Sequence, residues 1–446
     1  MNFQFYAFSG KSVNCYGLSV VCQNLWQRGH TCLAYSTDST DQVLLSCYWP
    51  EQIFDILRFR YRGVNKSRRF IVGGNTATAN PSVFLEHVDG VFLGDGEDWD
   101  GNTLHDNVVT KDTDAPKNKA VAARLNPVPY VDVQSATRSF IEISRGCRNR
   151  CFFCQYGWLK KYKEASLSDV ADAVGSAKTK TIRLFAADRF QHSQYVGIRE
   201  MMDRRGKCDS GSDASLRYLL KHKEYFGYTN KIRTGIEGMS ERLRRAVNKP
   251  ISDDQIVESV VLAQEHRIKV IDWYMIYGLP GEGLDDMEKF VALLARIDKE
   301  LSGPLNIAVH WNAFTPSAQT PLQWAPPAHN YSFRRELLER TGVAHRLPKL
   351  TVYHKPLLTS RETVAKRTLA TRAGIGFEKL LFTIAKSPRV FSKSFDGIFN
   401  RAFELSGVDL LSEWPSDEPL PWDRYVVYDR ERMLRIWRRY KERMGV

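Results

Sequence analysis

The chain lacks several features that would place it in a familiar class. No stretch approaches the roughly 18 to 20 uninterrupted apolar residues that span a bilayer, so no membrane-spanning segment is expected. The first residues, MNFQFYAFSGKSVNCYG, lack a basic region followed by an apolar run and a cleavage site. Eight cysteines in 446 residues are too few for a disulfide scaffold. These absences predict a cytoplasmic protein in a reducing compartment.

Common catalytic signatures are also missing. The string GKSVNCYG has neither the glycine spacing nor the Lys-Ser context of a phosphate-binding loop, and no hydride-cofactor motif or nucleophile dyad is visible. His192, His310 and His329 are read as solvent or core partners. His192 and Asp188 follow a predicted strand end, where they could face a substrate.

Length and composition favour a globular protein of more than one domain. With 446 residues, 43% hydrophobic and 26% charged, the chain exceeds one ordinary core. Residues 331–446 carry 23 Lys and Arg against 14 Asp and Glu, a large share of the net charge of +13. Residues 430–443 predict a basic helix, which either docks with a solvated face or contacts phosphates. A polyanionic substrate is therefore favoured.

The pattern of apolar segments predicts two α/β domains. Residues 1–125 alternate strand-like and helix-like segments and suggest a small Rossmann-like, doubly wound layer. Residues 100–135 are polar and are expected to form a linker or a strap across the surface. From residue 138 the alternation restarts and predicts six strands of a partial β/α barrel, with 214–220 as the third strand. We expect domains at 1–125, 126–330 and 331–446, the last mainly helical and basic.

Three cysteines stand close together in the stretch SRGCRNRCFFCQYGW. Cys147, Cys151 and Cys154 follow a predicted strand, where barrel enzymes gather their catalytic groups. A structural zinc site needs four ligands, and neither a fourth cysteine nor a histidine lies near. A 4Fe-4S cluster held by three cysteines keeps one iron free for a small molecule. The other five cysteines are scattered, and Cys15 and Cys22 are expected to face a core.

The cysteine spacing, with Phe153 before the last cysteine, resembles the signature of radical S-adenosylmethionine (SAM) enzymes. Three further stretches, IEGMSERLRRAVNKPIS, YMIYGLPGEGLDD and NAFTPSAQTPLQW, resemble the subfamily with an N-terminal cobalamin-binding-type domain, and EPLPWDRY in the tail does so weakly. The resemblance covers residues 1 to about 325. It implies a cluster-bound SAM that is cleaved to a 5'-deoxyadenosyl radical.

The resemblance also implies roles for single residues. Cys147, Cys151 and Cys154 would bind the cluster. The residues that would contact SAM are Phe153, Arg217 on the third strand, Glu237 at the end of the fourth strand, Gly278 and Pro280. Glu282 is expected to cap the following helix. Gly73, Gly74 and the turn Gly94 to Glu97 are expected to be structural.

Departures from the subfamily narrow the expected chemistry. Cobalamin bound base-off normally uses a DxHxxG loop, and the nearest string, LEHVDG at 85–90, lacks its Asp and spacing. We therefore do not expect cobalamin. Sulfur insertion needs a further cluster that the scattered cysteines do not offer. An isomerase acting on an amino-acid-modified thymine in phage DNA is the favoured function.

Alternatives stay open beside that function. They are a cobalamin-dependent radical SAM methyltransferase on a small metabolite, a tRNA or RNA base-modifying radical SAM enzyme, and a nucleic-acid-binding protein with a structural or sensing cluster. The expected partners are modified DNA and an electron donor such as flavodoxin or ferredoxin. A phage-encoded enzyme would work in the host cytoplasm.

Overall fold

The computed structural model describes most of the chain. The described residues are 1–6, 16–34, 42–62, 65, 67–131, 137–211, 213–328, 335–336, 339–340, 344–355, 361–374, 376–386 and 395–446. Cys15 and His329 therefore lie outside the described residues. None of the described helices is long and apolar enough to cross a membrane.

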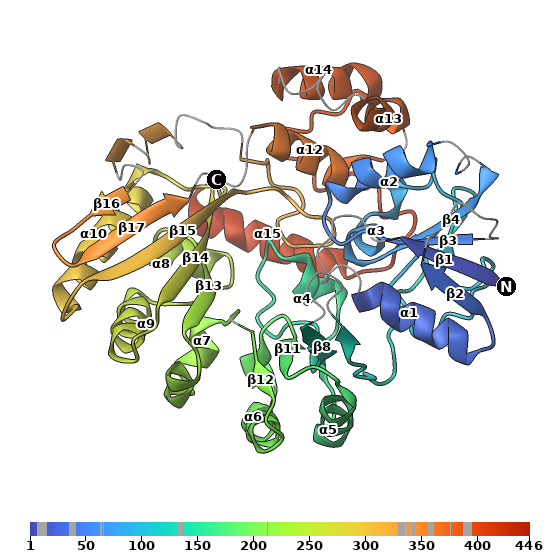
Figure 1. Cartoon of the computed structure of the whole chain (residues 1–446). Helices are drawn as coiled ribbons and strands as arrows, with labels where there is room; N and C mark the ends of the chain where they lie inside the picture. The colour runs from blue at the N-terminus through green and yellow to red at the C-terminus, as the bar shows by residue number, and fades with distance from the viewer. Residues whose placement is uncertain are drawn as a thin grey trace.

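The N-terminal domain is a six-stranded sheet with helices on its faces (Figure 1). Its strand order is β2-β1-β3-β4-β5-β6, and every pairing is parallel except that of β5 with β6. The elements are β1 (Asn2–Tyr6), α1 (Tyr16–Gln27), β2 (Thr31–Ala34), β3 (Gln42–Ser46), α2 (Gln52–Arg60), β4 (Arg69–Gly73), α3 (Asn75–Ala79), β5 (Gly90–Phe92) and β6 (Val108–Val109). The inner strands are buried on both faces, which explains their continuous apolar runs. The Rossmann-like prediction is confirmed.

The second domain is a partial barrel made of two sheets. One sheet has the order β12-β11-β8-β7 and the other β13-β14-β15-β17-β16. Their strands are β7 (Tyr130–Val131), β8 (Arg138–Glu142), β11 (Thr181–Phe185), β12 (Cys208–Asp209), β13 (Lys231–Glu237), β14 (Val270–Tyr277), β15 (Leu305–Ala313), β16 (Ala344–Arg346) and β17 (Leu350–Lys355). Among the described residues, an isolated bridge between Asp213 and Arg233 connects the segment after β12 to β13.

Helices cover the outside of this barrel, as the sequence predicts. They are α5 (Leu167–Ser176), α6 (Tyr195–Arg204), α7 (Leu216–Leu219), α8 (Glu241–Ala246), α9 (Asp253–Glu265) and α10 (Leu284–Glu300). Ser166, Ser240 and Ser252 each accept a hydrogen bond from a backbone N–H in the first turn of the helix that follows. The capped starts therefore fix where the helices begin.

One predicted strand is wrong. Residues 214–220 were expected to form the third strand, but Leu216–Leu219 is the short helix α7. Leu216 and Leu219 are buried while Arg217 between them is exposed, and the spacing of three residues suits a helical turn. The third strand is instead the two-residue β12, which pairs with β11.

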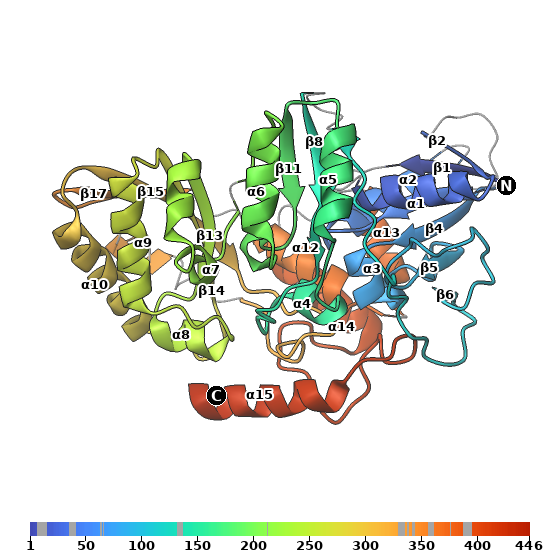
Figure 2. The ribbon, with the colours of Figure 1, turned by 90° about the horizontal axis from the view of Figure 1, so that it is seen from below.

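The C-terminal region is mainly helical and contacts both domains. Its helices are α12 (Arg361–Arg372), α13 (Glu378–Lys386), α14 (Phe395–Ser406) and α15 (Arg430–Met444). The helix α13 packs against α2 of the N-terminal domain, and α14 packs against α12 (Figure 1). Asn80 donates to the carbonyl oxygens of Thr371 and Ala373, at the end of α12, at 3.1 and 2.9 Å. The basic helix α15 runs alongside the barrel next to α8 (Figure 2). Its buried residues are Met433, Trp437, Tyr440 and Met444.

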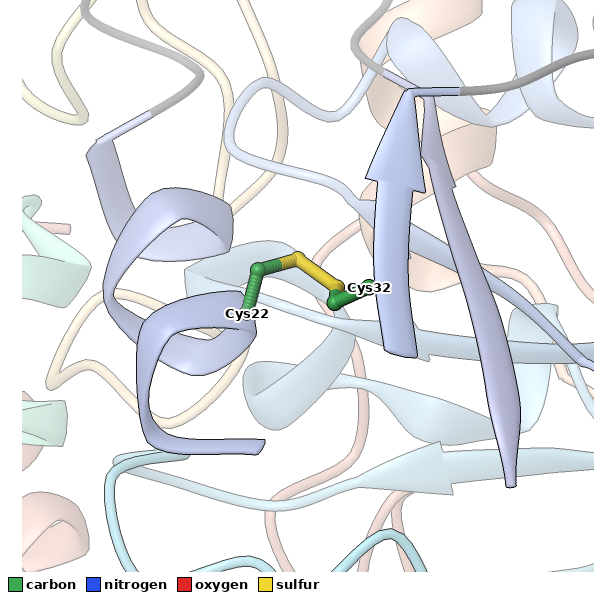
Figure 3. The surroundings of a disulfide bond; sticks show 2 residues. All are labelled: Cys22 and Cys32. Atoms are coloured by element: carbon green, nitrogen blue, oxygen red, sulfur yellow. A yellow bond between two sulfur atoms is a disulfide. The ribbon is translucent and has the colours of Figure 1, made fainter. Parts of the chain in front are cut away.

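Two of the scattered cysteines lie together. Cys22 on α1 and Cys32 on β2 form a disulfide, with 5.5 Å between their Cα atoms (Figure 3). Cys22 is buried, as expected, but the pairing was not predicted. A short turn after α1 returns the chain as β2 beside the helix, and this places the two thiols together.

Candidate functional site

The loop that carries the three cysteines follows the first barrel strand. The loop runs from the short strand β9 (Ser144–Arg145) to the helix α4 (Gln155–Leu159). The backbone N–H of Phe152 donates to the Val247 carbonyl at 3.0 Å. The Asn248 amide donates to the Asn149 and Arg150 carbonyls at 2.8 and 3.1 Å. The loop is thus held against the end of α8, at the carboxyl edge of the barrel.

The three thiols are close enough to influence one another. Cys151 is buried, and Cys147 and Cys154 are partly exposed. Burial raises the pKa of the Cys151 and Cys154 thiols, and the charges of the neighbouring cysteines raise both further. Thiolates at this position therefore need a positively charged partner, which an iron cluster provides.

The donor set fits an iron-sulfur cluster. Within the described residues, no three His, Cys, Asp or Glu side chains gather tightly enough to hold a single metal ion. A cluster is held differently, because each thiolate binds its own iron. Cys147, Cys151 and Cys154 are thus the residues that would hold it, with one iron left for another ligand.

A polar chain supports the first cysteine. The Gln191 amide donates to Cys147 Sγ at 3.4 Å and to Asp188 at 3.3 Å. Asp188 also accepts from the Phe190 N–H at 3.1 Å, and its pKa is raised to about 6 by burial. His192 pairs with the Ala165 carbonyl at 3.1 Å, so it is a core partner as expected. Gln191 was missed because one glutamine in a loop gives no sequence signal.

Glu237 ends β13, as predicted, and forms an ion pair beside the cysteines. Its Oε1 lies 2.8 Å from Lys249 Nζ, and both side chains are largely buried. Burial alone would lower the pKa of Lys249, but the charges of Glu237 and Cys151 raise it well above its ordinary value. Glu237 has a φ of 70°, a strained value for a residue with a side chain. Lys249 thus places a fixed positive charge next to the thiols.

The other predicted SAM contacts lie in different settings. Phe153 is partly buried against the core, inside the cysteine loop. Gly278 directly follows β14 with a φ of 76°, and a Cβ there would meet the Ala328 Cβ at 2.3 Å. The Pro280 carbonyl accepts from the Tyr440 hydroxyl at 2.9 Å. Arg217 lies on α7 and not at a strand end, so its position gives its predicted role no support.

The expected helix cap at Glu282 is also wrong. Its carboxylate accepts from the Gly278 N–H and so closes the turn before the helix. The cap of α10 is formed at Gly283, whose N–H donates to Asp286 at 3.0 Å. Burial raises the pKa of Glu282 to about 8. A neutral carboxylic acid thus sits in the GLPGEG turn near pH 7.

A cavity that is partly open to solvent lies between the two domains, and it encloses about 1040 Å³ when the solvent space at its mouth is included. It is bordered by the carboxyl ends of β3, β4 and β5, the start of α1, and the side chains of Glu142, Arg145, Tyr156, Lys160 and Phe185 from the barrel. Ligands bind at such strand ends in open α/β sheets and in barrels. Here the two edges share one cavity.

This cavity lies beside the cysteines. Tyr48 borders it, and the pKa of the Tyr48 hydroxyl is raised to about 12 by burial and then by the charge of Cys154. Gly73, Gly74 and the turn Gly94 to Glu97, expected to be only structural, line the cavity. No histidine lines it among the described residues.

Ion pairs join the two domains at the cavity wall. Asp95 of the N-terminal domain lies 2.6 Å from Lys160 Nζ and 3.1 Å from an Arg145 guanidinium nitrogen. Arg145 also contacts Glu142 at 2.7 Å and Glu97 at 2.5 Å. Arg145 precedes the cysteines and Lys160 follows them. The two ends of the cysteine loop are therefore tied to one turn of the other domain.

The site thus combines a donor set that fits an iron-sulfur cluster with a cavity that both domains line. Residues 141–294 match the model of the Radical SAM superfamily. This part of the chain is a radical SAM domain.

Relatives and solved structures extend this result. The uncharacterized protein MJ0966 of Methanocaldococcus jannaschii is 23% identical over 291 residues, which span 58% of this chain and 64% of that protein, less than two thirds of its length. The radical SAM methyltransferase TsrM from Kitasatospora setae, solved with cobalamin and a 4Fe-4S cluster, matches with a TM-score of 0.53 and 12% identity, over 72% of this chain and 77% of that chain. The cobalamin-dependent radical enzyme OxsB matches with a TM-score of 0.52 and 12% identity, over 100% of this chain and 79% of that chain. These likenesses show a shared fold.

The comparison corrects one expectation. We did not expect cobalamin, but both solved neighbours were determined with cobalamin bound. The argument rested on a single missing string, DxHxxG. The cavity itself is formed by strand ends and glycines from distant segments, and no single string encodes it.

Proposed function

We propose that the protein is a cobalamin-dependent radical SAM enzyme acting on a small metabolite. The observation that carries the proposal is the cavity shared by the carboxyl edge of the N-terminal sheet and the cysteine loop. The fold shared with TsrM and OxsB supports it.

Different residues around the site would bind the large ligand, SAM and the cluster. The glycine-lined strand ends would hold the large ligand through the backbone, and Phe153, Glu237, Gly278 and Pro280 would hold SAM next to the loop. The cluster, when bound, supplies the electron that cleaves SAM. Lys249 and Gln191 keep the thiols in place through charge and a hydrogen bond.

Binding of hydroxocobalamin tests the proposal. A Cβ at Gly73 would lie 3.9 Å from its nearest neighbour, so Gly73→Leu can fold while filling the cavity. The matched control is Gly227→Leu, at an exposed position with similar room. We expect the wild type and the control to retain about one corrin per chain after gel filtration, seen by its visible absorption, and Gly73→Leu to lose it. A wild type without bound corrin would contradict the proposal.

A second candidate function is the modification of a polyanionic substrate. The isomerase acting on an amino-acid-modified thymine in DNA, or an enzyme acting on an RNA base, is favoured by one observation, the exposed arginines of α15. Reconstituted enzyme would be incubated with such DNA, and the nucleosides separated by mass spectrometry. A product of unchanged mass and shifted retention is expected for the isomerase, and unchanged nucleosides would eliminate it.

A further inference from the structure

The helix α4 presents two different faces. Tyr156 and Lys160, four residues apart, border the cavity between the domains. Trp158 stands between them in sequence, which places it on the other side of the helix. On that side Arg432 of α15 reaches the Trp158 ring. The helix after the cysteines thus separates the cavity from an outer surface.

Trp158 links this outer surface to a cluster ligand. Its indole N–H donates to the Cys151 carbonyl at 3.0 Å. The guanidinium carbons of Arg150 and Arg432 lie 5.8 and 5.7 Å from its ring centre. Two positive charges therefore flank a partly exposed aromatic ring that is one hydrogen bond from the backbone of Cys151.

The helix α15 extends this positive surface. Its 15 residues include seven Arg or Lys and two Glu. Arg432, Arg438 and Arg439 are exposed, and within the described residues none of them has a carboxylate partner at ion-pair distance. The buried side of the helix packs through Trp437 and Tyr440. The arginines are thus held in position by a docked helix and stay free for a partner.

We propose that Trp158 and the exposed arginines of α15 form the docking surface for an acidic one-electron carrier protein of the flavodoxin class. One electron would pass from the carrier to the cluster. The carrier is oxidised by one electron, the cluster is reduced by one, and no bond forms or breaks in the protein. The inference rests on the radical SAM cluster and is independent of cobalamin.

The position of the patch favours a carrier over a nucleic acid. A modified base must reach the inside of the barrel to be altered, whereas Trp158 lies on the outer side of the cysteine loop. Electron-transfer encounters are small, transient and steered by charge, and a few unpaired arginines around a ring next to a cluster ligand suit them. Phosphate contacts alone would not require this closeness to Cys151.

Charge reversal tests the surface. The variant Arg438→Glu/Arg439→Glu is compared with Arg204→Glu/Arg401→Glu, which has the same net charge but alters exposed side chains on α6 and α14, 71% and 57% exposed. The readouts are the affinity for reduced flavodoxin and the rate of cluster reduction followed by its absorption. Each rate is divided by the rate with dithionite, a small reductant that needs no docking surface.

We expect the ratio to fall by about tenfold or more in the α15 variant at low salt, and the affinity for flavodoxin to weaken, with little change in the control. The difference should shrink as salt screens the charges. Equal losses in both variants, or no loss in either, would overturn the proposal. The proposal would also be overturned if flavodoxin reduced the α15 variant at the wild-type rate while the variant no longer bound a DNA duplex. The assay needs no corrin, so a failure to bind cobalamin leaves its result intact.

Discussion

Replacing Asp95 with Asn should loosen the cysteine loop. The Asp95 side chain is 3% exposed and contacts Lys160 and Arg145, which flank the three cysteines. It also accepts from the Ala122 N–H at 3.1 Å. Asn keeps the shape but removes the charge, so Lys160 becomes a buried cation without its carboxylate. Arg145 retains Glu142 and Glu97.

The expected loss is large for a single polar change. Removing one partner of a buried ion pair costs about 3 to 5 kcal/mol, and Asn should fall near the lower value because its oxygen can still accept hydrogen bonds. Burial alone would raise the pKa of Asp95, but Lys160 and Arg145 hold it well below its ordinary value. A carboxyl group whose pKa is lowered by folding stabilises the fold at pH values above its unfolded pKa, which is near 4, and this contribution is lost as the pH falls. The variant and the wild type should therefore converge in acid.

Urea unfolding at pH 7 and hydrogen exchange of residues 145–160 measure the effect. Glu288→Gln is the control, because its pair with Arg340 is exposed on both sides, 65% and 36%, and should contribute less than about 1 kcal/mol. Protection of the loop amides should fall in Asp95→Asn and not in the control. If Asp95→Asn has the same free energy of unfolding as the wild type and its loop amides exchange at the wild-type rate, the idea that this ion-pair network holds the loop is refuted.

Three further outcomes are expected. Cys154→Ala should lower iron and sulfide from about four each per chain to well below one in anaerobic preparations. The control Cys208→Ala changes an exposed cysteine and should keep the wild-type content, so equal iron contents in the two variants would contradict the assignment. Burial alone would raise the pKa of the Asp272 carboxyl, but Lys355, His310 and Arg233 lower it to about 2. Asp272→Asn should therefore destabilise the protein by about 2 kcal/mol at pH 7, with the difference from wild type fading between about pH 4 and pH 2, and a pH-independent difference would refute this. Burial raises the pKa of Glu282 to about 8, so the contribution of this carboxyl to stability should fall by up to about 4 kcal/mol from pH 4 to pH 8. The stability of wild type relative to Glu282→Gln should fall by that amount in urea unfolding, and a difference that does not change with pH would rule this out.

Local features of the fold were predictable. The cysteine triplet needs only spacing and a preceding strand, and both are visible in the letters 139–154. The basic helix was found because its apolar residues recur at helical spacing, and Met433, Trp437 and Tyr440 are indeed buried. The error at 214–220 has the same origin, since a short apolar run fits a strand or a helical turn equally well.

The cavity could not be predicted, because its walls come from segments far apart in sequence. Ser46, Gly73, Asp95 and Arg145 meet there only after the parallel sheet has formed and the barrel has docked on it. Each residue alone reads as a turn, a strand end or a surface charge. Ion pairs such as Asp95 with Lys160 leave no periodic signal either, so the link between the domains appears only in the structure.

The short helix α4 after the cysteines separates two approaches to them. A five-residue helix has room for two faces, and here Tyr156 and Lys160 take one while Trp158 takes the other. The inner face borders the space where a large ligand can meet the cluster, and the outer face carries the hydrogen bond to Cys151 and the arginines of α15. An electron that enters at Trp158 and a substrate that reacts in the cavity would therefore approach the cysteines from opposite sides. Neither would need to leave for the other to act, and a reductant docked at Trp158 would stay outside the space where the radical would form.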